Sequence, residues 1–221
     1  MTQTDDNWIQ ALWDWADTNS VSDLEWIQHD SYLKSGYYRG LPRDKEQLLN
    51  LTELNLLGSQ LSSLPPEIGK LIKLEKLYLL GNQLAELPQE ISNLTKLKEL
   101  YVAGNQLKAI PQEINALKNL EALLLQENQI EVVPQEIGEL HNLKILELGK
   151  NALTSLPKEI GQLTNLTKLT LWKNQLCAFP QEITNLTNLQ ELDFLYNKIA
   201  LTKEHMIWLE KLMEKDCHLS L

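Results

Sequence analysis

The sequence predicts an α/β solenoid with a parallel β-sheet along one face, short helical segments behind it and a helical cap at each end. Three observations predict this fold class. The chain repeats with a period of 23 residues, so that LEKLYLLGNQLAELPQEISNLTK at 74–96 is followed by LKELYVAGNQLKAIPQEINALKN at 97–119. Leucines keep fixed places within the period while the letters between them change. Both ends of the chain leave the pattern.

Six repeats are complete and a seventh ends after Ile199, with the shared pattern L-x-x-L-x-L-x-x-N-x-L-x-x-L-P-x-E-I-x-x-L. Their first residues are Leu51, Leu74, Leu97, Leu120, Leu143, Leu166 and Leu189. A period of about 20 to 29 residues with this leucine spacing resembles the leucine-rich repeat family. The L-P-x-E-I-G-x-L ending resembles its 23-residue class, found in many bacterial repeat proteins and in Ras-suppressor-type proteins. The resemblance covers residues 41–201 and implies a horseshoe whose strands line the concave face.

Each repeat contains a segment such as LNLLG or LTLWK, in which alternate positions differ as they do in a β-strand. We expect one leucine at the middle of each strand, and the residue two positions later, to point into the core. These leucines are Leu54, Leu77, Leu100, Leu123, Leu146, Leu169 and Leu192. One repeat cannot bury them alone, whereas stacked repeats can. The strands should therefore pair in parallel, about 4.8 Å apart.

Three other positions each recur in six of the seven repeats and have structural explanations. An asparagine after the strand can satisfy backbone groups that no ladder reaches, and Ser59 replaces it in the first repeat. The asparagines are Asn82, Asn105, Asn128, Asn151, Asn174 and Asn197. A proline fits the first position of a short helix, and a glutamate two residues later lies near its positive end. The prolines are Pro65, Pro88, Pro111, Pro134, Pro157 and Pro180, and the glutamates are Glu67, Glu90, Glu113, Glu136, Glu159 and Glu182.

Residues 1–50 predict an N-terminal cap that ends in a degenerate half-repeat, LPRDKEQLLNL, which aligns with LPPEIGKLIKL at 64–74. A solenoid needs caps because its terminal repeats would otherwise expose their leucines. DDNWIQALWDWADTN predicts an amphipathic helix with Trp8, Ile9, Leu12, Trp13 and Ala16 on its apolar face. Ser22 with Glu25 predicts a capping box and a second short helix.

Aromatic residues are concentrated in this cap. Four of the six tryptophans and three of the six tyrosines lie in residues 1–38. We expect them to cover the open end of the core, because aromatic side chains bury large apolar areas. The alternative is a separate aromatic docking site.

Residues 51–201 hold the repeats, and residues 202–221 predict a C-terminal cap. TKEHMIWLEKLMEKD predicts a helix over 203–215 with Thr202 as its N-cap. We expect Met206, Leu209, Leu212 and Met213 to form its apolar stripe. The final CHLSL either packs beside the helix or trails in solvent.

The formal net charge of −10 argues against nucleic acid and anionic membranes as partners, because phosphate binding needs clustered Lys and Arg. No apolar run approaches the roughly 18 to 20 residues that span a bilayer. The start, MTQTDDNWIQ, lacks the basic and apolar regions of a Sec signal peptide, so we expect a cytoplasmic protein or one exported without such a signal. Reduced thiols are expected at Cys177 and Cys217, although a disulfide between them stays open.

The sequence contains no motif for catalysis, a cofactor or a metal. Its four histidines, His29, His141, His205 and His218, stand singly, with no H-x-x-x-H and no nearby cysteine pair. Phosphate-binding, dinucleotide-binding and nucleophile-elbow motifs are absent. The glutamate series indicates a structural ladder, because an active site occurs once. We therefore predict that the protein is not an enzyme and uses no cofactor or metal.

The strand positions that face away from the core should form a concave surface, and there the repeats differ. Apolar residues at these positions on adjacent strands indicate a protein-binding site, because contiguous apolar area often marks an interface and Tyr and Trp often carry binding energy. The predicted contacts are Leu57, Tyr78, Leu80, Tyr101, Leu124, Trp172, Leu195 and Tyr196. A row of alternating charges beside them, Glu53, Lys76, Glu99, Lys168 and Glu191, is explained by cross-strand pairing.

These observations predict a module that binds a partner protein through its concave sheet. Two alternatives remain open at this point. One is an exported bacterial effector that binds a host protein, and the other is a homodimer formed through the apolar patch.

Overall fold

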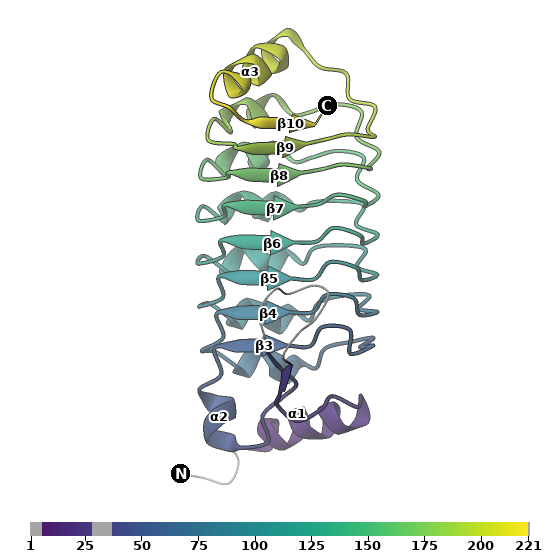
Figure 1. Ribbon diagram of the computed structural model, residues 1–221, viewed down its shortest axis with the longest axis vertical. Helices are drawn as coiled ribbons and strands as arrows, with labels where there is room; N and C mark the ends of the chain where they lie inside the picture. Colours follow the sequence, from purple (N-terminus) through teal and green to yellow (C-terminus); the bar gives the residue numbers. More distant parts are fainter. Residues whose placement is uncertain (1–5, 28–36, 221) are drawn as a thin grey trace.

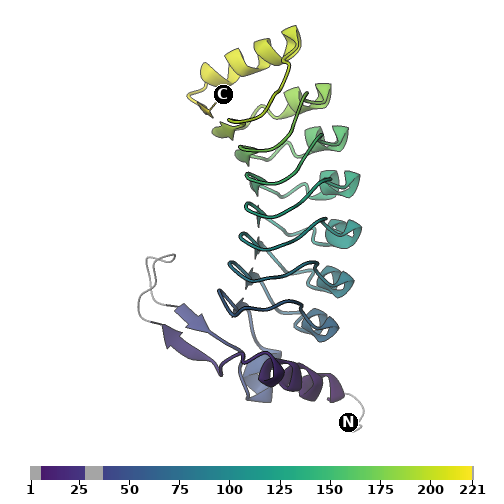
Figure 2. The same ribbon diagram turned by 90° about the vertical axis from the view of Figure 1, so that its right-hand side faces the viewer.

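The computed structural model describes residues 6–27 and 37–220. They form a curved stack with strands along its concave side and short helices along its convex side (Figures 1 and 2). Helix α1 lies at one end of the stack and helix α3 at the other (Figure 1). The predicted α/β solenoid with a parallel sheet is confirmed. Within the described residues, no helix is long and apolar enough to cross a membrane.

Eight strands form one parallel sheet, in the order β10-β9-β8-β7-β6-β5-β4-β3. They are β3 (Glu53–Asn55), β4 (Lys76–Tyr78), β5 (Glu99–Tyr101), β6 (Ala122–Leu124), β7 (Ile145–Glu147), β8 (Lys168–Thr170), β9 (Glu191–Asp193) and β10 (His218–Ser220). The repeats pair in phase, so that Leu54 opposes Leu77 and Leu169 opposes Leu192. All seven predicted inward leucines are at most 1% exposed. The stacked leucines thus form one continuous core.

Six 3-10 helices return the chain along the convex side: η1 (Pro66–Lys70), η2 (Gln89–Asn93), η3 (Gln112–Ala116), η4 (Gln135–Glu139), η5 (Lys158–Gln162) and η6 (Gln181–Asn185). Each predicted proline is the extended N-cap of its helix, one residue before the position that we predicted. Adjacent helices pack closely where the helix contains glycine. A Cβ on Gly161 would lie 2.2 Å from the carbonyl oxygen of Glu182.

The asparagines form the predicted ladder between repeats. Asn105 Oδ1 accepts a hydrogen bond of 3.0 Å from the Leu84 N–H, and its Nδ2 donates to the carbonyls of Leu79 and Val102, both at 2.9 Å. Asn82, Asn128, Asn151, Asn174 and Asn197 repeat this pattern. In the first repeat, Ser59 Oγ accepts instead from Arg39 Nη2 at 3.5 Å. The side chains therefore satisfy backbone groups at the turn that the strand ladder leaves unpaired.

At the N-terminal end, helix α1 (Asn7–Thr18) buries the predicted Ile9, Leu12 and Ala16. Three tryptophans, Trp8, Trp13 and Trp15, pack partly buried against the core. Helix α2 (Lys45–Leu49) forms from the half-repeat and is capped by Asp44, whose side chain accepts from the Gln47 N–H. Of the cap's aromatic residues, Tyr32 lies outside the described residues.

The short helix predicted from Ser22 and Glu25 is wrong. Residues Glu25–Ile27 are strand β1, which pairs antiparallel with strand β2 (Tyr37–Arg39). Ser22 Oγ donates to the Glu25 carboxylate at 3.4 Å instead of capping a helix. Aromatic and β-branched residues around these positions favour a strand, and their pairing outweighs the local capping pattern.

At the C-terminal end, helix α3 (Lys203–Met213) begins after Thr202, as predicted, and Thr202 Oγ1 accepts from the His205 N–H. The predicted apolar stripe is partly wrong. Leu209 and Leu212 are buried, but Met206 and Met213 are 47% and 60% exposed. Trp208 and His205 are buried instead of the two methionines. The indole nitrogen and the imidazole Nδ1 can be buried because the indole donates to the Leu186 carbonyl at 3.1 Å and Nδ1 accepts from the Thr202 N–H. CHLSL then adds β10 beside β9.

Candidate functional site

The outward positions of β3 to β6 carry the first group of predicted contact residues. Tyr78 and Tyr101 lie on adjacent paired strands, with ring centroids 5.0 Å apart in an edge-to-face arrangement. Leu80, Tyr101 and Leu124 are partly buried. Leu57 and Tyr78 are each only 8% exposed, so they form the floor of the surface. The structure thus brings these five residues together in a shallow apolar patch.

Burial and charge change the ionisation of the two tyrosines. Burial raises the pKa of Tyr78 above its ordinary value, and the negative charges of Glu99 and Glu53 raise it further. Burial also raises the pKa of Tyr101, together with its hydrogen bond to Glu99. Both phenols therefore stay neutral donors well above neutral pH.

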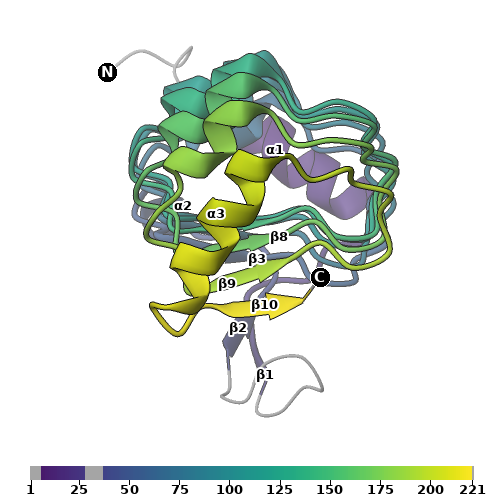
Figure 3. The same cartoon turned by 90° about the horizontal axis from the view of Figure 1, so that it is seen from above.

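A pocket of about 480 Å³ lies beside the aromatic pair. Its floor comes from Leu57, Leu80 and Ala103, which occupy equivalent places on three successive repeats. At one end stands Arg39 from β2, and at the other stand Gln126 and Glu127. The β1–β2 hairpin projects on the sheet side of the solenoid, which is how a residue of the N-terminal cap reaches this surface (Figures 2 and 3).

Three glycines, Gly58, Gly81 and Gly104, line the edge of the pocket in the left-handed conformation, with φ of 59°, 64° and 66°. The same turn in later repeats holds Glu127, Lys150, Lys173 and Tyr196, also at positive φ. A Cβ on Gly58 or Gly81 would meet nothing within 4 Å. The turn therefore tolerates side chains, and the glycines leave the pocket open on that side.

Trp172 belongs to the second predicted group, on the C-terminal half of the sheet. Its indole lies over Gly149, because a Cβ at Gly149 would be 2.1 Å from Trp172 Nε1. Trp172 and Leu195 are partly buried, whereas Tyr196 is 77% exposed at a left-handed turn. The bare backbone of Gly149 lets the indole extend toward the first group.

Ion pairs occupy the edges of the concave surface. Lys76 Nζ lies 2.9 Å from the Glu99 carboxylate, and Lys168 Nζ lies 2.9 Å from Glu147 and 3.2 Å from Glu191. These contacts join adjacent strands, so the predicted cross-strand pairing is confirmed for Lys76 with Glu99 and for Lys168 with Glu191. Glu147 joins the second pair although it was not in the predicted row. Further along, Lys150 and Glu127 pair at 2.7 Å between two turns.

Three buried polar atoms on this face have no hydrogen-bond partner within the described chain. They are Asn55 Nδ2, Gln126 Oε1 and Thr170 Oγ1. A buried polar atom without a partner costs about 1–3 kcal/mol, so such atoms are uncommon in folded proteins. Their positions span the sheet from β3 to β8.

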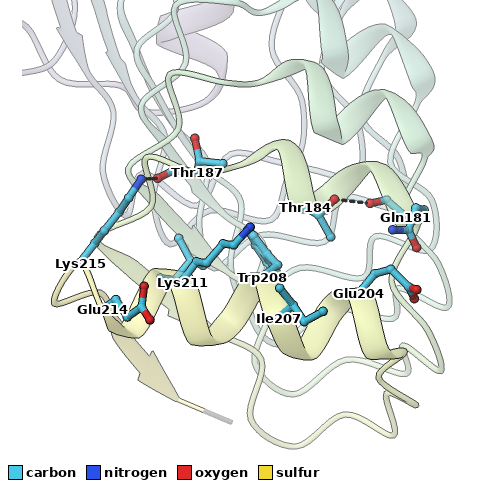
Figure 4. Close-up of a pocket in the computed structure, with 10 residues that line it drawn as sticks. Gln181, Thr184, Thr187, Glu204, Ile207, Trp208, Lys211, Glu214 and Lys215 are labelled. Atoms are coloured by element: carbon cyan, nitrogen blue, oxygen red, sulfur yellow. Dashed lines mark hydrogen bonds between the residues drawn. The ribbon is translucent and has the colours of Figure 1, made fainter.

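A second hollow, of about 690 Å³, lies between α3 and η6 (Figure 4). Trp208 and Leu212 form its apolar floor. Ile207, Lys211 and Glu204 line it from α3, and Thr184 lines it from η6. Lys215 Nζ donates to the Thr187 carbonyl at one end. Helix α3 does not pack on η6 as closely as neighbouring repeats pack on each other, and the hollow lies between these two helices.

Outside this surface, the described ionisable side chains gather in ion pairs such as that of Arg43 with Asp17 and Asp23. Within 6–27 and 37–220, no three His, Cys, Asp or Glu side chains are placed to hold a metal ion. Cys177 is exposed and Cys217 is buried, both as free thiols. Burial raises the pKa of the Cys217 thiol, and the charge of Glu191 adds to this effect.

The predicted contacts omit several residues of this surface, and two of them, Arg39 and Gly149, shape it most. Arg39 carried no signal, because nothing in the sequence shows that the hairpin reaches the sheet. Gly149 stands in a variable position and became informative only once Trp172 was seen above it.

Family models and solved structures agree on the kind of protein. One family model, described as leucine rich repeat, matches residues 49–107, and another, described as leucine-rich repeat region, matches residues 122–217. A leucine-rich repeat protein of Leptospira interrogans is 40% identical, with a TM-score of 0.72, over 82% of this chain and 45% of its own. The comparison with curated proteins returned no match.

Two further structures share the fold. The leucine-rich repeat ectodomain of the membrane receptor kinase GASSHO1/SCHENGEN3 from Arabidopsis thaliana is 38% identical, with a TM-score of 0.64, over 72% of this chain and 20% of its own. An internalin of Listeria monocytogenes is 23% identical, with a TM-score of 0.63, over 82% of this chain and 54% of its own. This chain therefore spans less than two thirds of each of these proteins. By its repeat, its sheet and both family matches, it belongs to the leucine-rich repeat proteins.

Proposed function

We propose that this chain is a non-catalytic module that binds a partner protein across its concave sheet. The observation that carries the proposal is the apolar, aromatic character of outward positions on β3 to β6, where an uncommitted surface would be mostly polar. Contiguous apolar patches of this kind usually mark interaction sites. We assign the repeats to the 23-residue class on their period.

The arrangement of the patch suits a protein partner. Tyr78 and Tyr101 hold each other in place, and Glu99 accepts from the Tyr78 hydroxyl at 3.4 Å. Rigid aromatic groups lose little side-chain entropy when they are covered by a partner. Trp172, lying over Gly149, supplies a second anchor near the middle of the sheet. The first contacts should therefore be Tyr101, Leu80 and Trp172, which remain partly accessible.

Similar proteins support the same proposal. The Arabidopsis ectodomain was solved in complex with CASPARIAN STRIP INTEGRITY FACTOR 2. The plant peptide hormone receptor RGFR1, 32% identical to this chain, was solved in complex with RGF2. Similarity to the Leptospira protein supports a bacterial source for this chain.

The test is affinity capture with three matched baits. The concave variant Leu80→Ser/Tyr101→Ser/Trp172→Ser removes three large side chains from the sheet face. The control variant Ile72→Ser/Val132→Ser/Met213→Ser removes three exposed hydrophobic side chains elsewhere. We expect proteins that wild type and the control retain but the concave variant loses. The proposal fails if the concave variant, shown by thermal melting to be folded, retains every protein that wild type does.

Two other measurements decide the alternatives. Sedimentation equilibrium of the pure protein would show a dimer that the concave substitutions dissociate, if the patch serves self-association. A secretion assay in the source organism would show export, if the protein acts on a host. A dimer that the concave substitutions dissociate would replace the proposed function with self-association. Export would leave the proposed function unchanged and would support a host protein as the partner.

A further inference from the structure

The chain has two arginines, and they are treated very differently. Arg43 forms ion pairs of 2.7 Å with Asp17 and 2.9 Å with Asp23, and donates to the carbonyls of Trp13 and Val21. It holds α1 and the hairpin base together. Arg43 is thus fully used by the fold.

Within residues 6–27 and 37–220, Arg39 has no carboxylate partner, although acidic residues outnumber basic ones by 30 to 20 in this chain. Its described contact is a weak hydrogen bond from Nη2 to Ser59 Oγ, at 3.5 Å. Glu25 lies directly across the hairpin from Arg39, but Glu25 accepts from Ser22 instead. A partly buried guanidinium with unused donors therefore stands at one end of the pocket.

The opposite end of the pocket carries the carboxamide of Gln126. Gln126 Oε1 is buried and has no donor within the described chain. Glu127 beside it is neutralised by Lys150, 2.7 Å away, so Arg39 supplies the uncompensated charge of the pocket. Between the two ends the floor is apolar, with Leu57, Leu80 and Ala103.

We propose that this pocket binds a short extended acidic segment of the partner protein. A carboxylate of the segment would lie on Arg39, and an apolar side chain on the leucine floor. An N–H group of the segment would bond Gln126 Oε1 once that side chain turns toward the pocket. This inference rests on the proposed function and names the kind of segment that the concave site takes.

The dimensions suit such a segment. The pocket runs from β3 to β6, which is three strand spacings or about 14 Å. An extended chain advances about 3.3 Å per residue, so about four residues reach from Arg39 to Gln126. Planar guanidinium groups bind carboxylates through two parallel hydrogen bonds. We therefore expect Arg39 to determine the preference of the pocket for an acidic residue.

Phage display of random heptapeptides on immobilised protein tests the proposal. Wild type should select peptides enriched in Asp or Glu next to an apolar residue. Arg39→Gln should lose that enrichment, whereas Lys173→Gln, which removes the same charge from a turn outside the pocket, should keep it. A selected peptide should bind Arg39→Gln at least about tenfold more weakly than wild type, since hydrogen bonds to charged groups are the stronger ones.

A second variant tests the pocket without touching charge. Gly81→Asn should fold, because Asn tolerates the left-handed conformation and the same turn holds larger residues in later repeats. Its side chain would enter the open space at the pocket edge and block the selected peptides.

Three outcomes of the peptide selection would overturn the inference. They are the absence of selected peptides, selection without acidic enrichment, and acidic enrichment that survives in Arg39→Gln. The capture experiment does not depend on any of these outcomes. If a partner protein binds wild type and the control variant but not the concave variant, the proposed function holds even when the inference about the segment is wrong. Glutarate, a free dicarboxylate, should not displace the peptide. If glutarate alone binds in an Arg39-dependent way, the ligand is a small acid and the segment is wrong.

Discussion

Trp172 lies directly over Gly149, so closely that a Cβ at Gly149 would be 2.1 Å from the indole nitrogen. The backbone of Gly149 lies outside the left-handed region, so glycine is needed here for space rather than for its conformation. The pair anchors the second predicted group of contact residues, on the C-terminal half of the sheet.

Gly149→Ala should therefore displace the indole and lower the free energy of unfolding by about 1–3 kcal/mol, the usual cost of overpacking. The urea midpoint of unfolding measures this loss. In a Trp172→Ala background the same substitution should cost almost nothing, because its clash partner is gone. Equal losses in both backgrounds would show that the indole does not occupy this position.

Alkaline pH should destabilise the protein through Tyr78 and Tyr101. Folding raises the pKa of both phenols above the ordinary value of 10.0. Above pH 10 the unfolded chain releases protons that the folded chain retains, so the free energy of unfolding falls as pH rises. Below pH 10 both states are protonated and the contribution is constant.

Urea titrations at about pH 8 and about pH 11 measure this loss. The variant Tyr78→Phe/Tyr101→Phe should lose less stability between the two pH values than wild type does. The tyrosine account is wrong if the variant and wild type lose the same amount.

Asn128→Ala should destabilise the centre of the stack. The substitution removes the acceptor for the Leu107 N–H and the donor to the carbonyls of Val102 and Leu125. Because each buried unpaired group costs about 1–3 kcal/mol, the three groups together should cost at least about 3 kcal/mol. Gln129→Ala, an exposed neighbour, is the control and should change the urea midpoint little. Similar losses for both variants would rule out the ladder as a source of stability.

Trp208→Ala should uncover the last repeat. Trp208 is 4% exposed and bonds the Leu186 carbonyl, so we expect a loss of about 3–5 kcal/mol. Met206→Ala, on the exposed side of the same helix, should cost less than about 1 kcal/mol. Thermal melting compares the two, and a larger loss for Met206→Ala would restore the stripe that the sequence predicted.

Much of the fold could be predicted because it depends on repetition. The inward leucines occur in every repeat and the asparagine ladder in all but the first, so one physical explanation applies to each of them. The caps lack this redundancy. In α3, the buried face is rotated by about one residue from the predicted stripe. His205 and Trp208 are therefore buried where Met206 was expected, because Trp208 packs against the last repeat.

The candidate site was only partly predictable for a related reason. Outward strand positions follow from the period of two, which located Tyr78, Tyr101 and Trp172. The exposed fraction of these side chains could not be predicted in this way, since neighbouring side chains shield Tyr78. Arg39 lies at the edge of a hairpin whose placement over the sheet depends on contacts far apart in the sequence.

The central claim is that the partner covers the concave sheet, and hydroxyl-radical footprinting of the chain with its captured partner tests it most directly. Partner binding should protect Tyr101, Trp172 and Tyr196 from oxidation, while Ile72 and Met213 react as in the free protein. Protection of Ile72 or Met213 with unchanged oxidation of Tyr101 and Trp172 would contradict the account.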